Sequence, residues 1–368
     1  MKWKIKYSIL GLAFWFLLFL TWEWWSSYPR VRLTPVSHPK SREARVDSIL
    51  IQSLSDFLIP GVAVGIVENE KIIYLKAFGY ENLATKDSLS LQSPLPVASV
   101  SKIFTALSLS RYALENGIEQ DTILNAILPR GKKLPEEFNW ISLRDLLTHQ
   151  SGITVQRNLK TLLISSDKRK LNLLPYHLSS PDLNDKTYHY ADVNFDLIGY
   201  ALETSSGQPF DSLIKENTLD AAGMFQSHFL TEEHSDTASF AGYKQTVIWK
   251  RIQSTKLKIE RYPSPSSGLV VTAEELSKAL LHLCRGSMGT FSRELNWLQG
   301  NTEMPAGFQQ ITIGNTQFIG HFGEQDGFSA ILIYSPSQEI GLFILANSRD
   351  KPDFRRQISA GILKVVSP

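Results

Sequence analysis

The stretch LPVASVSKIFTAL, from Leu95 to Leu107, carries the first candidate for chemistry. It places Ser99 three residues before Lys102 in an otherwise apolar setting. Residues three apart on a helix share a face, so the Lys102 ammonium is predicted to reach the Ser99 hydroxyl. The positive end of the helix dipole favours a developing alkoxide at a helix N-terminus. Apolar neighbours are expected to lower the pKa of Lys102 and let it act as a base.

A serine and a lysine at this spacing are not by themselves a catalytic signal. The pattern Ser-x-x-Lys occurs five times, as Ser37–Lys40, Ser99–Lys102, Ser165–Lys168, Ser212–Lys215 and Ser348–Lys351. A helix cap followed by a solvated lysine explains most such pairs. The pair at Ser99 differs because an extended segment with two prolines precedes it and a long helix follows.

Strand patterns lie at both ends of the chain. GVAVGIVENEKIIYLKAFGY, residues 61–80, predicts two strands joined by a polar turn at Glu68–Lys71. TQFIGHF, FSAILIYS and EIGLFILAN, which begin at Thr316, Phe328 and Glu339, indicate three more strands. We therefore expect an α+β fold with one antiparallel sheet that is built from both termini.

The residues between these strands have mainly helical patterns. SVSKIFTALSLSRYALENG (99–117), ADVNFDLIGYALETSSG (191–207) and TAEELSKALLHLCRG (272–286) are the clearest, and each closes on glycine. RDKPDFRRQISAGILKVV (349–366) predicts a closing helix. The sheet is thus expected to be flanked by helices, with a mostly helical region inserted. The basic stretch Lys250–Arg261 is predicted to be a solvated hairpin or insertion.

The N-terminus combines lysines with an apolar run. Three lysines among the first six residues precede a mainly apolar stretch from Tyr7 to Trp22, and more tryptophans follow. As a helix this stretch would be roughly 24 Å long, against about 30 Å for a bilayer core, and the tryptophans would lengthen the anchor. A cleaved signal peptide is the alternative, but no small-x-small site follows the run. We expect 1–25 to be a signal-anchor or transmembrane segment, 26–47 a linker, and 48–368 a domain outside the cytoplasm.

Composition argues against several classes of function. The chain has 368 residues, of which 43% are hydrophobic and 20% charged, so it can bury a sizeable core. A net charge of +2 gives no electrostatic reason to expect nucleic acid as a partner. The single cysteine, Cys284, excludes an intrachain disulfide and a multi-cysteine metal site. The expected partners are a small-molecule or peptide substrate and, through the N-terminal helix, a membrane.

Three more stretches accompany the Ser99 motif in a fixed order. They are WISLRDLLTHQSGI (140–153), YHYADVNFDLIGYALE (188–203) and FIGHFGEQDGFSAILIYSP (318–336). Together they resemble the serine β-lactamase and penicillin-binding-protein superfamily. The most similar branch contains class C β-lactamases, D-stereospecific peptidases and related esterases. The resemblance covers roughly Leu54 to Ser348, and four weak motifs in the right order make a strong signal.

The resemblance implies roles for the residues of the first two motifs. Ser99 matches the family's nucleophile, Lys102 its lysine, and Tyr190 the tyrosine of the Tyr-x-Asn motif. Asp192 stands where that motif has asparagine. An ionised Asp192 near Lys102 would hold the lysine protonated, and Tyr190 would then be the better base.

The third motif departs further from the family pattern. His321-Phe322-Gly323 matches Lys-Thr-Gly in the His-x-Gly form of esterase-like and peptidase-like relatives. Gly323 permits close approach of substrate to the strand edge, and the oxyanion hole would use the backbone N–H groups of Ser99 and Glu324. If His321 must hold one protonation state, activity is expected to change in the pH range where histidine titrates. His149, in HQSG, is expected to be structural and to lie away from the chemistry.

We therefore expect an exported serine hydrolase that forms an acyl-enzyme on Ser99 and cleaves ester, amide or lactam bonds. D-amino peptides of the peptidoglycan type, which a cell wall would supply, and small esters are the expected substrates. Neither a metal nor an organic cofactor is expected. A β-lactamase proper is the first alternative, although the loss of Lys-Thr-Gly argues against efficient β-lactam hydrolysis. A non-turnover penicillin-binding or sensor domain is the second.

Overall fold

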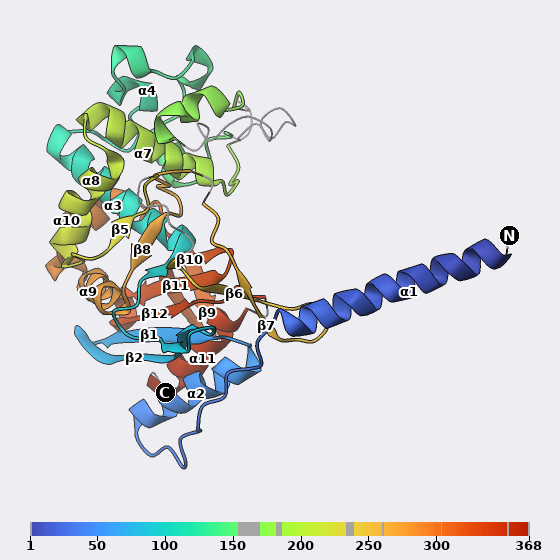
Figure 1. Ribbon diagram of the computed structural model, residues 1–368. Helices are drawn as coiled ribbons and strands as arrows, with labels where there is room; N and C mark the ends of the chain where they lie inside the picture. Colours follow the sequence, from blue (N-terminus) through green and yellow to red (C-terminus); the bar gives the residue numbers. More distant parts are fainter. Residues whose placement is uncertain are drawn as a thin grey trace.

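The computed structural model describes residues 2–153, 170–181, 186–232, 239–259, 261–302, 304–351 and 353–366. The Ser165–Lys168 pair lies outside them. Seven antiparallel strands form the main sheet, in the order β3-β2-β1-β12-β11-β10-β9 (Figure 1). Their bounds are β1 Gly61–Glu68, β2 Lys71–Asn82, β3 Asp87–Ser88, β9 Gln309–Ile313, β10 Thr316–Gln325, β11 Phe328–Ser335 and β12 Ile340–Ala346. Pairing of β1 with β12 confirms a sheet built from both termini.

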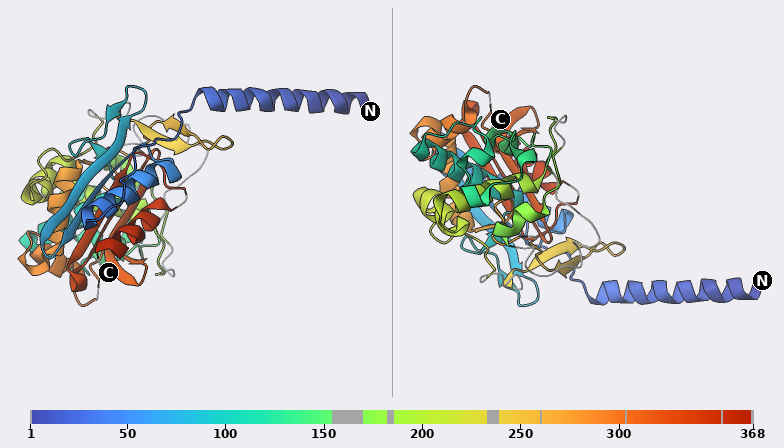
Figure 2. Two further views of the ribbon diagram at one scale, coloured as in Figure 1. Left: turned by 90° about the horizontal axis from the view of Figure 1, so that it is seen from below. Right: turned by 90° about the horizontal axis from the view of Figure 1, so that it is seen from above.

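Alternate residues of the strands enter two different cores, as the period of a strand requires. Val62 and Val64 of β1 belong to the core under α2 (Arg42–Asp56) and α11 (Phe354–Val366). Ala63 between them belongs to the larger core on the other face. Figure 2 shows α2 and α11 side by side across one face of the sheet. The central strands β1, β11 and β12 are therefore buried on both faces.

The larger core contains the helix that follows Ser99. This helix, α3 (Ser101–Asn116), is buried along its first ten residues, 101–110. It ends at Gly117, whose φ of +64° is the left-handed conformation that glycine adopts without strain. α7 (Asp192–Ser206) ends in the same way at Gly207. Both predicted helices and their glycine caps are confirmed.

The remaining elements cover the face of the sheet opposite α2 and α11, or lie at the edges of the sheet (Figure 1). The helices are α4 Leu124–Ile127, α5 Leu143–Leu147, α8 Phe210–Ile214, α9 Ala273–Cys284 and α10 Ser292–Gln299. A small sheet pairs β4 Leu95–Pro96, β8 Leu269–Val271 and β5 His228–Phe229, and β6 Gly242–Gln245 forms a hairpin with β7 Ile252–Thr255. This is the α+β architecture with inserted helices that the sequence predicts.

The N-terminal helix α1 (Lys2–Trp25) projects from the body (Figure 1). Its segment Tyr7–Trp25 is long and apolar enough to cross a membrane, with a mean hydropathy of 1.4 and 6% of its residues buried. The structure differs from the predicted linker 26–47 at both ends. Tyr28 pairs with Ile252 of β7, and α2 already begins at Arg42. Val31 between these two points is buried in the core under α2 and α11, so much of the predicted linker packs on the domain.

Candidate active site

Ser99 lies in a tight 3₁₀ turn, η1 (Ala98–Val100), directly before α3. Ala98 has a φ of +49°, a left-handed conformation that residues with a Cβ rarely adopt. The Ser101 hydroxyl donates to the Ala98 carbonyl at 2.6 Å and accepts from the N–H of Leu269 at 3.0 Å. These bonds hold the strained turn in place and fix the position of Ser99.

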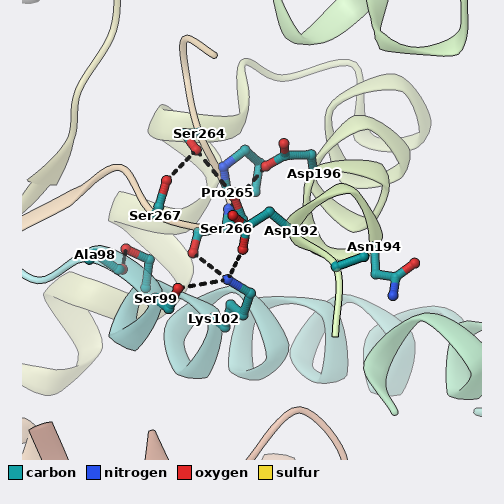
Figure 3. A network of polar contacts seen from close by, with 12 residues as sticks. Ala98, Ser99, Lys102, Asp192, Asn194, Asp196, Ser264, Pro265, Ser266 and Ser267 are labelled. Atoms are coloured by element: carbon teal, nitrogen blue, oxygen red, sulfur yellow. Dashed lines mark hydrogen bonds and ion pairs between the residues drawn. The ribbon is translucent and has the colours of Figure 1, made fainter. Parts of the chain in front are cut away.

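Lys102 is fully buried, and its ammonium group donates three hydrogen bonds (Figure 3). The acceptors are Ser99 Oγ at 3.1 Å, Asp192 Oδ1 at 2.6 Å and the Ser266 carbonyl at 2.9 Å. An ammonium group has three N–H donors, so every donor of Lys102 is satisfied. The structure therefore brings Ser99, Lys102 and Asp192 together.

The pKa of Lys102 is not lowered in the way that its apolar neighbours in the sequence predicted. Burial favours the neutral amine, but the neighbouring Asp192 carboxylate and Tyr190 oppose it and raise the pKa of Lys102 above its ordinary value. The expected lowering is therefore wrong, because the carboxylate lies in direct contact with the ammonium. A protonated lysine cannot accept the Ser99 proton, and this favours Tyr190 as the base.

The Ser266 carbonyl is delivered by a loop that the sequence analysis did not single out. Thr105 of α3 donates to the carbonyl of Pro265 at 2.7 Å. Asp196 of α7 accepts from the N–H of Ser266 at 3.1 Å and pairs with Arg261 at 3.1 Å. Buried polar groups on two helices thus hold the loop against Lys102. The only sequence signal was the Ser-Pro-Ser-Ser run at 264–267, which by itself indicates a turn.

Tyr190 precedes α7 and faces Lys102, whose Nζ lies 5.0 Å from the centre of the tyrosine ring. The His149 ring packs on the Tyr190 ring, with centroids 4.5 Å apart. His149 Nδ1 accepts from the N–H of Ala191 at 3.2 Å and lies 3.1 Å from Asn194 Nδ2. The expectation that His149 lies away from the chemistry is therefore wrong. The turn is structural, but its side chain positions Tyr190.

His321 is buried in β10, with its ring centre 6.0 Å from that of Tyr190. Burial and the nearby Lys102 ammonium lower the pKa of His321 to about 3 and that of His149 to about 4. Both rings are therefore neutral at physiological pH. A change of activity in the pH range where histidine usually titrates is therefore not expected from either ring, because a buried ring beside a cation resists protonation.

These two histidines give a prediction for pH dependence. We expect neither to produce a midpoint in ester turnover between pH 5 and 8, because their pKa values are about 3 and about 4. Unfolded histidine has a pKa of about 6.5, so below that pH the unfolded chain binds more protons and the free energy of unfolding should decrease as pH falls toward 4. Turnover and thermal unfolding across pH 4 to 8 check both statements. A turnover midpoint near 6.5 that disappears in His321→Gln would contradict the first.

Gly323 packs directly against the turn that carries Ser99. A Cβ on residue 323 would lie 2.0 Å from the Val97 carbonyl oxygen and 3.2 Å from Ser99 N. Pairing of β10 with β9 extends only to Gly320, so this part of β10 has no strand on its outer edge within the described residues. The N–H of Ser99 and the Gly323–Glu324 segment lie close together, as an oxyanion hole formed by Ser99 and Glu324 would require.

Arg355 of α11 holds this part of β10 in place. It is buried, donates to the Gly323 carbonyl, and pairs with Asp350 at 2.6 Å and with Glu324 at 3.1 Å. Arg349 pairs with the other carboxylate oxygen of Glu324 at 3.0 Å. The Glu324 side chain is thus engaged by two arginines, which leaves its main chain as the part that can serve the site. No motif in the sequence pointed to Arg355.

The contact of Gly323 with Val97 predicts the effect of one added methyl group. Gly323→Ala should lower ester turnover by about 10- to 100-fold, because the strand or the Ser99 turn must move and small displacements of reacting groups are costly. Kinetics beside thermal unfolding measure this effect. Gly131→Ala is the matched control, since a Cβ there meets nothing within 4 Å. Wild-type turnover in a folded Gly323→Ala protein would show that the contact does not matter.

A pocket of about 440 Å³ opens beside these residues. His149, His321 and Tyr188 form the wall nearest Tyr190. The rest of the lining is mainly apolar and includes Leu147, Met304, Ala306 and Phe308, with Arg144 and Gln309 among the polar residues. A pocket of this size whose exposed surface is mainly apolar suits an apolar substituent of a small substrate.

Comparison with known proteins decides the family. A family model described as Beta-lactamase matches residues 47–366. The chain belongs to the β-lactamase family. Protein flp of Staphylococcus aureus (strain NCTC 8325) is 23% identical over 322 residues, which are 83% of this chain but only 63% of flp. A β-lactamase of Psychrobacter immobilis is 25% identical over 345 residues and covers 83% of both chains.

Two solved structures have the same fold as this chain. The octameric penicillin-binding protein homologue from Pyrococcus abyssi superposes with a TM-score of 0.69 at 19% identity, over 88% of this chain and 77% of its own. A β-lactamase from Sulfitobacter sp. EE-36 gives 0.70 at 17% identity, over 88% and 97%. Family membership confirms the resemblance seen in the motifs. The β-lactamase-family homologues also support serine hydrolase activity in general terms.

Metal ligands do not cluster in the described part of this β-lactamase-family chain. Within it, no group of three or more His, Cys, Asp and Glu side chains is placed to hold a metal ion. The expectation that the reaction uses neither a metal nor an organic cofactor stays a prediction.

Proposed function

We propose that this chain is a serine hydrolase in which Ser99 forms an acyl-enzyme with an ester, amide or lactam substrate. One observation carries the proposal. The Ser99 hydroxyl lies on a strained turn, 3.1 Å from a fully buried lysine whose other two donors are fixed by Asp192 and Ser266. A structural serine needs none of these arrangements, whereas a nucleophile needs a fixed position and a charged neighbour.

In the mechanism we propose, Tyr190 takes the proton of Ser99 as the hydroxyl attacks the substrate carbonyl. Tyr190 acts in this step as a phenolate, which the protonated Lys102 stabilises before the phenolate accepts the proton. The N–H groups of Ser99 and Glu324 hold the oxyanion. Tyr190 then gives its proton to the leaving group, and the acyl-enzyme remains. A water molecule, deprotonated by Tyr190, releases the acyl group and regenerates the Ser99 hydroxyl.

We propose small uncharged esters and amides as the preferred substrates, with D-amino peptides of the cell-wall type, which end in a carboxylate, as the less favoured class. Two features support this preference. The neutral His321 and the apolar Phe322 present no cation for a substrate carboxylate. The adjacent pocket is mainly apolar. Hydrolysis of β-lactams is the second candidate, because a β-lactamase is among the relatives that match over most of both chains.

We also propose that α1 anchors the chain and that the catalytic domain lies outside the cytoplasm. The apolar segment Tyr7–Trp25 supports an anchor by its length and composition. Lysines at residues 2, 4 and 6 favour a cytoplasmic N-terminus.

Trapping of the acyl-enzyme tests the proposal. The full chain in detergent is mixed with p-nitrophenyl acetate, quenched with acid, and analysed by intact mass and peptide mapping. We expect steady release of nitrophenol and an acetyl group on Ser99. A single burst followed by a stable adduct would support the sensor alternative instead. Acetylation only at other residues would overturn the assignment of Ser99. A parallel assay with a chromogenic cephalosporin separates the two substrate candidates.

A further inference from the structure

The β6–β7 hairpin is joined to the last turns of α1 through Glu23. The Glu23 side chain, in a residue only 2% exposed, accepts from the N–H groups of Val247 at 2.7 Å and Trp249 at 3.0 Å. The N–H of Ile248 between them donates to both carboxylate oxygens, at 3.1 and 3.2 Å. The tip of the hairpin, Val247–Trp249, therefore has its backbone donors satisfied by one carboxylate of α1.

Side chains strengthen this junction. The Trp249 indole donates to the Leu20 carbonyl at 2.9 Å and packs edge-on against Trp24, with ring centroids 5.4 Å apart. Arg251 donates to Ser27 Oγ and to the Ser27 carbonyl, both at 2.9 Å, and lies over the Trp24 ring. The end of α1 is thus built into the domain and does not lead into a free tether.

The junction fixes the depth of the tip relative to α1. The apolar span Tyr7–Trp25 has 19 residues. At about 1.5 Å per residue its length is close to the 30 Å thickness of a bilayer core. Its tryptophan-rich end, Trp22–Trp25, then lies at the membrane interface, where such residues concentrate. Because Trp249 bonds to Leu20, the hairpin tip must lie at the same depth.

The tip has the chemistry that such a position requires. Val247, Ile248 and Trp249 are 63%, 45% and 43% exposed although all three are large and apolar. Residues 242–259 contain five basic residues and no acidic one, namely Lys244, Lys250, Arg251, Lys256 and Lys258. Apolar side chains at a tip, flanked by cations, suit the boundary between acyl chains and anionic headgroups.

We propose that the Val247–Trp249 tip inserts into the headgroup region of the membrane that α1 crosses, with anionic lipid as its partner. The domain would then have two contacts with the bilayer and a fixed orientation. The basic stretch Lys250–Arg261 was predicted to be a solvated hairpin or insertion. The structure places the hairpin earlier, at Gly242–Thr255, so only its second strand falls within that range and the tip that we assign to lipid lies before it. This inference rests on the proposed membrane anchor and is independent of the catalytic proposal.

Fluorescence from a single label tests the contact. Ile248→Cys in the full chain is labelled with an environment-sensitive dye and reconstituted in vesicles of phosphatidylcholine and phosphatidylglycerol with a doxyl-labelled lipid. The label is introduced in a Cys284→Ser background, because the native Cys284 is only partly buried. The control is Gln338→Cys, an exposed position in the turn after β11. The hairpin lies against the other end of β11, where Gly242 meets Phe328, so residue 338 is far from the tip.

We expect a blue shift and quenching by the doxyl lipid at residue 248, at least about twice the quenching at residue 338. Removal of phosphatidylglycerol should weaken the quenching at residue 248. Equal quenching at both positions in vesicle-bound protein would overturn the tip contact while leaving the anchor intact. Failure of the protein to float with the vesicles would overturn both. Val247→Cys repeats the measurement should Ile248→Cys not fold.

Discussion

Replacement of Ser99 by alanine is expected to reduce turnover of p-nitrophenyl acetate by about 10⁴-fold or more, since removal of a covalent nucleophile leaves only binding and oxyanion stabilisation. The fold should be retained. Ser99 accepts one hydrogen bond from Lys102, whose other two acceptors remain. Turnover measured beside thermal unfolding separates lost chemistry from lost structure.

Ser212→Ala is the matched control, because Ser212 and Lys215 form another Ser-x-x-Lys pair in this chain. We expect wild-type turnover in that protein. Equal turnover in wild type and Ser99→Ala would mean that another group cleaves the ester, and the assignment of the nucleophile would then be wrong.

Replacement of Lys102 by methionine is expected to lower the same activity by about 10³-fold, within the range for groups that assist proton transfer. Methionine has a similar volume and removes a buried charge together with its desolvation cost. The partner left behind, Asp192, has a side chain that is 58% exposed and stays solvated. The chain should therefore fold. An inactive but folded Lys102→Met protein supports a direct role for the ammonium, whereas near-normal turnover would exclude one.

Asp192→Asn shows which group is the base. It removes the carboxylate that raises the pKa of Lys102, so the lysine should lose its proton at a lower pH. If Tyr190 is the base and Lys102 must stay protonated, the alkaline decline of kcat/KM moves to lower pH. If neutral Lys102 is the base, activity of the variant instead increases at neutral pH. The sign of the change decides between them.

The sheet and the main helices were predictable because their signals are local. The apolar runs of β1, β11 and β12 indicate strands buried on both faces, and the structure places them in the centre of the sheet. Gly117 and Gly207 mark helix ends because the left-handed conformation suits glycine. Helix spacing predicted that Lys102 reaches Ser99, whereas the placement of Asp192 beside them was implied by the resemblance of its motif to the family pattern.

Other parts of the site depend on packing that no local pattern contains. Ser266 contributes a carbonyl oxygen, which every residue has, so its identity carries no signal. His149 acts through ring contact with Tyr190, which the sequence of its own turn does not indicate. Arg355 reaches Gly323 from a helix on the opposite face of the sheet. The pKa of Lys102 depends on the placement of Asp192, and apolar neighbours alone predicted the wrong direction.

The complete burial of Lys102 also determines how the protein meets amine-reactive reagents. Its three N–H groups are already donated, and its side chain has no exposed surface. Surface lysines such as Lys244 and Lys250 should be acetylated at once by an anhydride, whereas Lys102 should react only when the region around it opens. The rate at which Lys102 acquires an acetyl group would therefore measure how often the folded protein exposes its own interior.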